Sequence, residues 1–331
     1  MKTSMFLVAV IIIVGVVAGA YLYITTMQTQ QKGEEKINAA TLLGGISTLD
    51  IIESQNLLEK TNYKLNVLRL QKTPDIIAAL ANGEADVAVI PAEMAAKLIE
   101  TGNDIVIFSV EMMQNQAILT LSNNIRNISD LVGRKVGAVV ASGTYKLFKA
   151  YMEQIYNLTV NEESSIKNDA INVVNILPGS IIDALVNGDV DAVVIWEPLV
   201  SKLVIEYNAT VVVDFGSMWK KYNSTLSPVM LVWVARGELV GTEKLKAFMD
   251  AQMEAARIWN ISSKLVIKVL MDLYNLKNET AHYLYNRVHV NTNPLDQQLI
   301  ESIRAEWRLA WLGGYLTSDP SIISDEAFFQ D

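Results

Sequence analysis

The sequence predicts an α/β protein made of two lobes, each built around a mainly parallel β-sheet. Two observations lead to this fold class. Apolar strands alternate with helices over most of the chain, and one helix–strand–helix segment occurs twice. The chain has 331 residues, of which 51% are hydrophobic and 19% are charged. This composition excludes disorder for the bulk of the chain and allows a large buried core.

Composition also excludes several classes of function. The chain has 27 Lys and Arg against 36 Asp and Glu, a net charge of -9. This balance argues against a nucleic-acid partner, because phosphate binding needs clustered basic side chains. The absence of cysteine excludes disulfides, thiolate metal sites and cysteine nucleophiles. With only two histidines, His282 and His289, we expect no metal site and no cofactor.

The N-terminal segment predicts a membrane anchor. Residues 5–24 are almost unbroken apolar positions, and no charge occurs between Lys2 and Lys32. A helix of that length spans roughly 30 Å, the thickness of a bilayer core, and Lys2 predicts that the rest of the chain lies outside the cell. The alternative is a cleaved signal peptide with its A-x-A pattern at residues 18–20, which would leave a secreted protein. We expect residues 1–35 to form the anchor and a polar tether.

Glycosylation sequons support export of the chain. Six N-x-S/T triplets occur, where composition alone would give about two or three. Chance and Asn-rich turns are the alternative explanation. An exported chain without cysteine fits a surface-anchored archaeal glycoprotein better than a bacterial lipoprotein. The candidate acceptors are Asn127, Asn157, Asn208, Asn223, Asn260 and Asn278.

Strands and helices follow one another in the order expected for parallel sheets. Short apolar runs bounded by Gly, Pro or Asn predict the strands, and residues that favour helix starts follow most of them. Strands are predicted at residues 37–43, 64–70, 87–90, 135–141, 171–177, 192–195 and 229–235, with helices opening near 47, 74, 144 and 180.

The last third of the chain predicts helices instead of strands. Thr242 is placed to cap one helix, and Ser262 or Ser263 opens a second. Pro294 is expected at the first position of a third helix, which Gly313 ends. The Trp and Leu side chains of these helices recur at helical spacing, which is typical of a packed core.

The repeated segment comprises residues 76–99, the first copy, and residues 181–204, the second copy. The two copies are identical at 11 of 24 positions without a gap. Both read as a helix, an Asn-Gly stop, an acidic turn, a buried strand and another helix. A duplicated structural unit is therefore favoured over convergence on a common local solution. We expect the acidic turns to lie where strands begin, away from a ligand site.

Three short motifs occur in a characteristic order. They are SDLVGRKVG at residues 129–137, SGT at 142–144 and DAVVIWEP at 191–198. Their order and spacing, with the helical tail, resemble those of the solute-binding proteins of ABC importers for sulfonates, nitrate and taurine. The resemblance covers about residues 36–320.

The resemblance implies a type II periplasmic-binding-protein-like fold. In this fold two lobes, joined by two crossing segments, close over a small molecule. The crossings are expected near residues 117–121 and 228–235. We therefore expect lobe 1 to comprise residues 36–121 with about 226–331, and lobe 2 to comprise residues 122–225.

The turns that follow predicted strands are candidate ligand-binding segments. Ser142, Gly143 and Thr144 follow a strand and open a helix, where free N–H groups and the helix dipole favour an anion. The alternative is an ordinary helix cap without a ligand. The equivalent turn of the first lobe contributes the candidates Gly45, Ser47 and Thr48.

Three further candidates bear on the charge of the ligand. Trp196 beside Glu197 suits an amine such as that of taurine; the alternative is a packed Trp and a solvated Glu. Glu93, where the family often carries small residues, would disfavour a simple anion such as nitrate if it faces the cleft.

The resemblance implies a protein that captures a small organic anion or zwitterion and delivers it to ABC permease subunits, and not an enzyme. One alternative is an enzyme of the same fold, similar to the iron-dependent pyrimidine synthases of thiamine biosynthesis. Those enzymes need Cys and His residues that this chain lacks. A second alternative is an extracellular ligand sensor.

Overall fold

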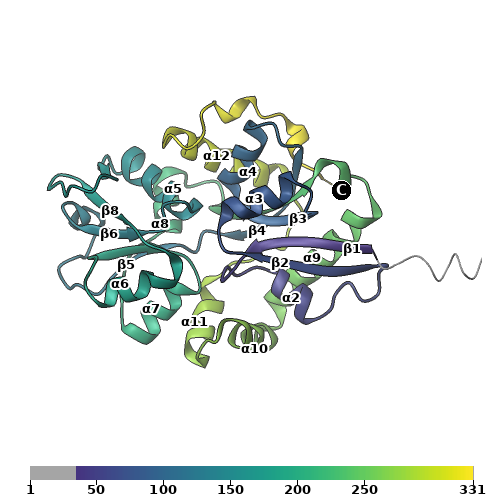
Figure 1. The fold of residues 1–331 in the computed structure, drawn as a ribbon, viewed down its shortest axis with the longest axis horizontal. Coiled ribbons are helices and arrows are strands. Elements are labelled where there is room, and N and C mark those ends of the chain that lie inside the picture. Colours follow the sequence, from purple (N-terminus) through teal and green to yellow (C-terminus); the bar gives the residue numbers. More distant parts are fainter. Residues whose placement is uncertain (1–34, 331) are drawn as a thin grey trace, which may run out of the picture.

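The computed structural model describes residues 35–330, which form two lobes side by side, each with one β-sheet and helices on its faces. In Figure 1 the lobe with β1 to β4 lies to the right and the lobe with β5, β6 and β8 to the left. The expected α/β fold class with two lobes is confirmed.

Within the described residues, the first sheet has five strands in the order β2-β1-β3-β11-β4. Strand β1 runs parallel to β2 and β3, and β11 runs antiparallel between β3 and β4. The carboxyl ends of the parallel strands therefore lie at one edge of the sheet. The strands are β1 (Glu35–Leu42), β2 (Tyr63–Leu70), β3 (Val87–Pro91), β4 (Ile105–Met113) and β11 (Val229–Arg236).

The second sheet has six described strands in the order β10-β5-β9-β6-β8-β7. Strand β6 runs parallel to β8 and β9, while β5 is antiparallel to its neighbours β9 and β10. The strands are β5 (Ala117–Thr120), β6 (Lys135–Ala138), β7 (Val160–Asn161), β8 (Ile171–Asn175), β9 (Ala192–Ile195) and β10 (Thr210–Asp214).

Helices cover the faces of both sheets. Those of the first lobe include α2 (Leu49–Ser54), α3 (Thr73–Ala81), α4 (Ala92–Glu100), α9 (Glu243–Ile261) and α10 (Ser263–Tyr274). Those of the second are α5 (Gly143–Ala150), which continues as a π-helical turn (Tyr151–Ile155), α6 (Ile181–Val186), α7 (Leu199–Tyr207) and α8 (Phe215–Tyr222). The C-terminal helices α11 (Asn278–Arg287) and α12 (Gln297–Leu312) lie at the junction of the lobes.

The two copies of the repeat fold alike. Helix α3 stops at Asn82 and Gly83, and α6 stops at Asn187 and Gly188. Both glycines have positive φ, +75° and +77°, which a residue with a side chain adopts only with strain. The next strands, β3 and β9, are buried along almost their whole length, as expected for central strands.

The crossings between the lobes differ in detail from the expectation. The sequence did not predict β4, which completes the edge of the first sheet beside β11. Residues Ala117–Thr120 were assigned to the first lobe, but they pair as β5 with β9 and β10 of the second sheet. The chain therefore crosses between Met113 and Ala117, and it returns between Tyr222 and Val229.

The helical tail follows the sequence closely, with one correction. Thr242 caps α9 and Ser263 opens α10, as predicted. The last long helix does not start at Pro294. It begins at Gln297, because the side chain of Asp296 caps it by accepting a hydrogen bond from the Leu299 N–H at 2.8 Å.

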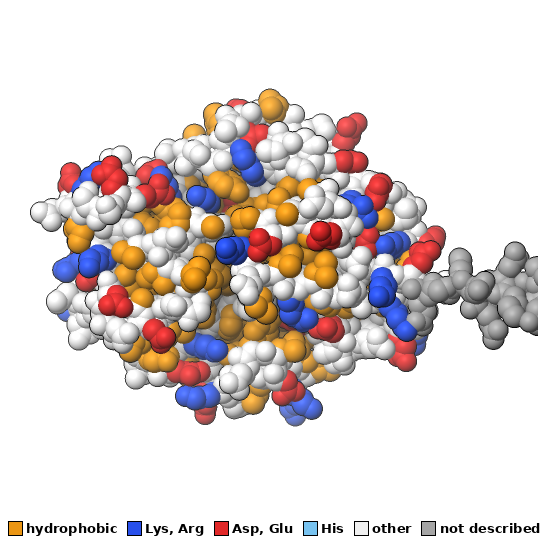
Figure 2. Space-filling view, viewed as in Figure 1, with side chains coloured by type: hydrophobic (Ala, Val, Ile, Leu, Met, Phe, Trp, Pro, Cys, Tyr) orange, Lys and Arg blue, Asp and Glu red, His pale blue; other side chains and the backbone are white. Residues whose placement is uncertain are grey.

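The expected membrane anchor lies outside the described residues. Between residues 35 and 330, no helix has the length and apolar character that a membrane crossing requires. Five of the six candidate glycosylation sites are exposed, and Asn223 is half-buried. Figure 2 shows basic and acidic side chains mixed over one face of both lobes, with apolar side chains between them.

Candidate functional site

A small cavity of about 50 Å³ lies between the two lobes. Its walls come from the carboxyl-end edge of both sheets, the edge where open α/β sheets bind ligands. Most of the wall is apolar, and among the described residues no Lys or Arg lines it. The apolar lining residues include Leu42, Ile46, Met112, Trp196, Met230 and Leu231, and the polar ones are Thr41, Thr73, Asn115, Ser142, Thr144 and Glu197.

The turn at the start of α5 lines the cavity from the second lobe. The Ser142 hydroxyl caps the helix: it accepts from the Tyr145 N–H at 3.2 Å and donates to Val139 O at 2.7 Å. The N–H groups of Gly143 and Thr144 have no acceptor within the described chain. Two amides and the positive end of the helix dipole are therefore available to an anion, while the Ser142 hydroxyl is committed to the cap.

The equivalent turn of the first lobe contributes less directly. Gly45 lines the cavity, but Ser47 and Thr48 are fully buried behind it. Both the N–H and the hydroxyl of Thr48 donate to the carboxylate of Glu111, at 2.5 and 2.8 Å. Glu111 also accepts from the Trp233 indole N–H at 2.5 Å. Thr48 thus fixes the turn, and the unpartnered Ser47 hydroxyl does not reach the cavity wall.

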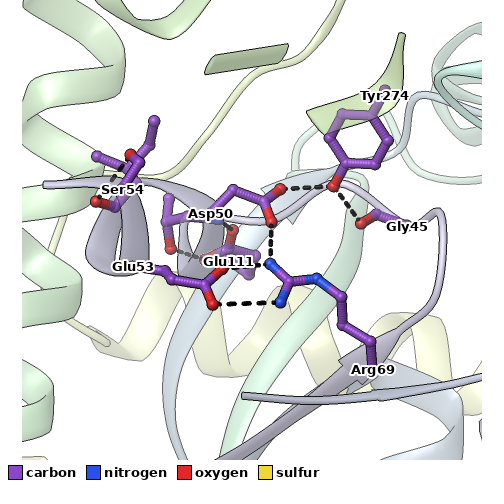
Figure 3. A network of polar contacts seen from close by, with 9 residues as sticks. Gly45, Asp50, Glu53, Ser54, Arg69, Glu111 and Tyr274 are labelled. Atoms are coloured by element: carbon purple, nitrogen blue, oxygen red, sulfur yellow. Dashed lines mark hydrogen bonds and ion pairs between the residues drawn. The ribbon is translucent and has the colours of Figure 1, made fainter. Parts of the chain in front are cut away.

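A second polar network holds the same turn from its outer side (Figure 3). The Tyr274 hydroxyl lies within hydrogen-bond distance of two acceptors, Gly45 O at 2.7 Å and Asp50 Oδ2 at 2.5 Å. Arg69 bridges Asp50 and Glu53 at 3.2 and 2.5 Å. Burial raises the pKa of Asp50, against the opposing effects of Tyr274 and Arg69. The backbone that lines the cavity at Gly45 is therefore held from both sides.

Trp196 and Glu197 form the far wall of the cavity. Glu197 is neither solvated nor free to meet an amine, because it is 1% exposed and paired with Arg287 of α11. Its Oε1 accepts from Arg287 Nε at 2.7 Å, and its Oε2 accepts from the Ser201 N–H at 3.0 Å. Burial raises the pKa of Glu197, and the Arg287 cation opposes that rise.

Glu93 does not line the cavity. Its fully buried carboxyl group contacts Gly143 of the second lobe and faces the equally buried Glu306 of α12. Burial raises the pKa of Glu93 to about 7. Burial and the nearby Glu93 raise the pKa of Glu306 well above its usual value. The pair therefore retains at least one proton at neutral pH.

Several residues in or beside the cavity wall were not singled out from the sequence. Thr41 and Thr73 end β1 and open α3, so the strand-end rule that identified Ser142 could have found them. Arg287 carried no such signal, because it lies on a late helix, 90 positions from Glu197. The described residues contain no cluster of three or more side chains suited to a metal ion.

The fold and the cleft define a two-lobed protein of the periplasmic-binding-protein type. The family model described as NMT1/THI5 like matches residues 59–258, more than half of the chain, and the chain belongs to this family.

Curated and structural relatives agree with that assignment. The taurine-binding periplasmic protein of Escherichia coli (strain K12) is 25% identical over 183 residues, or 54% of this chain. The match spans about half of that relative, 52% of its length.

Two solved structures share the fold over nearly their whole length. The alkanesulfonate-binding protein of Xanthomonas axonopodis pv. citri, bound to MOPS, has a TM-score of 0.71 at 17% identity and covers 89% of this chain and 98% of its own. The periplasmic aliphatic sulphonate-binding protein of Escherichia coli has a TM-score of 0.68 at 19% identity, with 87% and 97% covered. The predicted two-lobed fold of the periplasmic-binding-protein type is confirmed.

Proposed function

We propose that the protein is an extracytoplasmic solute-binding protein that captures a small organic anion between its lobes and delivers it to an ABC importer. The observation that carries the proposal is the cavity at the carboxyl edges of both sheets, with the unpaired amides of Gly143 and Thr144 in its wall. Family membership and the relatives that bind taurine and alkanesulfonates support the same role.

The wall chemistry favours a particular kind of anion. Two backbone donors at a helix start suit one sulfonate or carboxylate group. Around them the wall is largely apolar, with Ile46, Met112 and Trp196 close by. Such a wall gains free energy by burying hydrocarbon and gains nothing from an ion without an apolar part. An organic sulfonate or carboxylate is therefore favoured over nitrate.

The cavity favours binding over catalysis. Glu197 is the one acidic side chain in the described wall, and both of its oxygens already accept hydrogen bonds. Neither a free general base nor an activated nucleophile stands beside the proposed ligand position. The alternative of a pyrimidine-synthase-like enzyme is accordingly disfavoured.

The proposed location of the protein is outside the cytoplasm. Residues 5–24 would anchor the chain in the membrane with the two lobes outside, or would be removed as a signal peptide and leave a secreted protein. The exposed sequons at Asn127, Asn157, Asn208, Asn260 and Asn278 would then be open to glycosylation.

The test is direct ligand identification. We expect native mass spectrometry of the purified chain to detect a co-purified small anion. Calorimetry with a series of alkanesulfonates and alkanecarboxylates should then give saturable binding at one site per chain. Failure of every anion in both series to bind, or chemical turnover of a bound one, would contradict the proposal.

A further inference from the structure

Glu197 lines the cavity, and both of its carboxylate oxygens already accept hydrogen bonds from the protein. Arg287 Nε, from helix α11, donates to Glu197 Oε1 at 2.7 Å. The Ser201 N–H, from helix α7, donates to Glu197 Oε2 at 3.0 Å. The crossing segment presents the neutral Asn115, whose Oδ1 lies 3.4 Å from the Glu197 N–H. Arg287 is therefore the charged group that faces this carboxylate from the elements packed around it.

The guanidinium of Arg287 is held in place from a second side. Its Nη2 donates to Asn115 O at 3.1 Å, so one side chain bonds both the crossing segment and the second lobe. Helix α11 lies against both α10 and α7. A second ion pair, between Lys277 just before α11 and Glu206 of α7 at 3.4 Å, supports the contact between α11 and α7. Arg287 thus pairs with Glu197 without lining the cavity itself, and the carboxylate in the wall already has a cation as its partner.

We propose that Arg287 sets the charge selectivity of the cavity: by pairing with Glu197 it makes the site accept organic anions and reject zwitterions that carry an ammonium group. This inference rests on the proposed function. It narrows the substrate class to anions whose remaining atoms are apolar, since Arg287 already neutralises the one acidic group in the described wall.

Loss of Arg287 should reverse the selectivity. A buried carboxylate without its cation is strongly disfavoured, so it must take up a proton or find another cation. The ammonium group of a zwitterion can supply that cation. Burial already raises the pKa of Glu197 with Arg287 present. In the variant an ammonium ligand must therefore displace a proton from Glu197, and its affinity should increase with pH.

The probes are taurine and propane-1-sulfonate, which have similar shapes and differ in an ammonium against a methyl group. Binding of both is measured by calorimetry to the full chain and to Arg287→Gln at pH 6 and pH 8. We expect the parent to prefer propane-1-sulfonate and the variant to shift the affinity ratio roughly tenfold or more toward taurine. The shift should be larger at pH 8.

Two control variants separate a change in ligand selectivity from a general loss of protein stability. Arg236→Gln removes an arginine that pairs with another buried carboxylate, Asp86, at 3.1 Å and far from the cavity wall. It should leave the ratio unchanged. Arg287→Lys keeps a cation beside Glu197 and should restore most of the parent preference.

The outcomes distinguish the inference from the proposed function. An unchanged ratio in a folded Arg287→Gln that still binds propane-1-sulfonate overturns the inference alone. No binding of any organic anion to the parent overturns the proposed function. If Arg287→Gln does not fold, Glu197→Gln decides, because it leaves the Arg287 cation unpaired and must shift the ratio further away from taurine. A shift toward taurine would then overturn the inference.

Discussion

The two copies of the repeat are alike where their strands begin and different where their strands end. In the first copy the Asp86 N–H donates to Asn38 O, and the Asn38 N–H donates back to Asp86 Oδ2, both at 2.8 Å. In the second copy Asp191 and Lys135 make the same two bonds, also at 2.8 Å. These acidic turns brace neighbouring strands and lie at the edge away from the cavity, as the sequence predicted.

At the cavity end the two copies neutralise a carboxyl group by different means. The first copy carries Glu93, which faces the buried Glu306 and whose pKa burial raises to about 7, so that it is partly protonated at neutral pH. The second carries Glu197, which is balanced by the Arg287 cation. The two copies therefore share their contacts at one edge of each sheet and differ at the opposite edge, which lines the cleft.

The largest expected effect tests how closely the first copy approaches Gly143, at the start of α5 in the second lobe. A Cβ on Gly143 would overlap the Glu93 carboxyl group and lie 2.8 Å from Pro91 Cβ. Gly143→Ala should therefore hold the lobes apart and weaken ligand binding roughly a hundredfold or more. Gly143→Pro would also remove a backbone donor and should abolish binding. Calorimetry with the identified ligand gives the affinities, and circular dichroism verifies folding.

The matched control is Gly179→Ala, in the turn before α6, where an added Cβ meets nothing within 4 Å. This variant should bind like the parent. Parent-like binding by Gly143→Ala would show that the lobes need not meet at Glu93.

The second prediction tests the proton held by the first copy. The folded-state pKa values of Glu93 and Glu306 both lie above the ordinary glutamate value of 4.5. Their protonation therefore favours the folded state. This contribution is fully present below about pH 4.5 and is lost as pH rises through about 7, the raised value for Glu93. Glu306→Gln should flatten the fall of the melting temperature over that range by roughly several degrees.

Glu100, on the same helix as Glu93, is the control with the opposite sign. Hydrogen bonds from Lys97, Thr317 and Ser318 outweigh the effect of burial and lower its pKa to about 2. Its contribution is present above pH 4.5 and lost below it, so Glu100→Gln should leave the slope between pH 4.5 and 8 unchanged. Equal slopes in the parent and Glu306→Gln would contradict a raised pKa of Glu306.

The parts of the fold that the sequence predicted well are those determined by short stretches of neighbouring residues. The Asn-Gly stops and the apolar runs of the repeat act over a few residues, and they located α3, β3, α6 and β9 well. Strand β4 was missed. Its apolar run contains Glu111, a charge that is tolerated because Thr48 and Trp233, far away in the sequence, donate to it.

The chemistry of the candidate site depends more on contacts between residues that are far apart in the sequence. The strand-end rule directed attention to Gly45, Ser142 and Trp196, and all three line one cavity in the structure. It could not predict the charge state of Glu93 or Glu197. Their partners, Glu306 and Arg287, come from C-terminal helices whose position at the junction follows from packing of the whole chain.

The smallest expected effect separates a helix cap from a ligand contact. Ser142 makes two cap bonds, so Ser142→Ala should cost about 1 kcal/mol of folding stability. The Gly143 and Thr144 amides remain, so we expect less than about a tenfold loss of affinity. Thr242 makes the same pair of bonds at α9, donating to Leu239 O at 2.6 Å and accepting from the Leu245 N–H at 3.3 Å. Thr242→Ala should match the stability loss in denaturant titrations and leave binding unchanged. An abolished affinity in Ser142→Ala, with stability equal to that of Thr242→Ala, would mean that the Ser142 hydroxyl turns from the cap to the ligand.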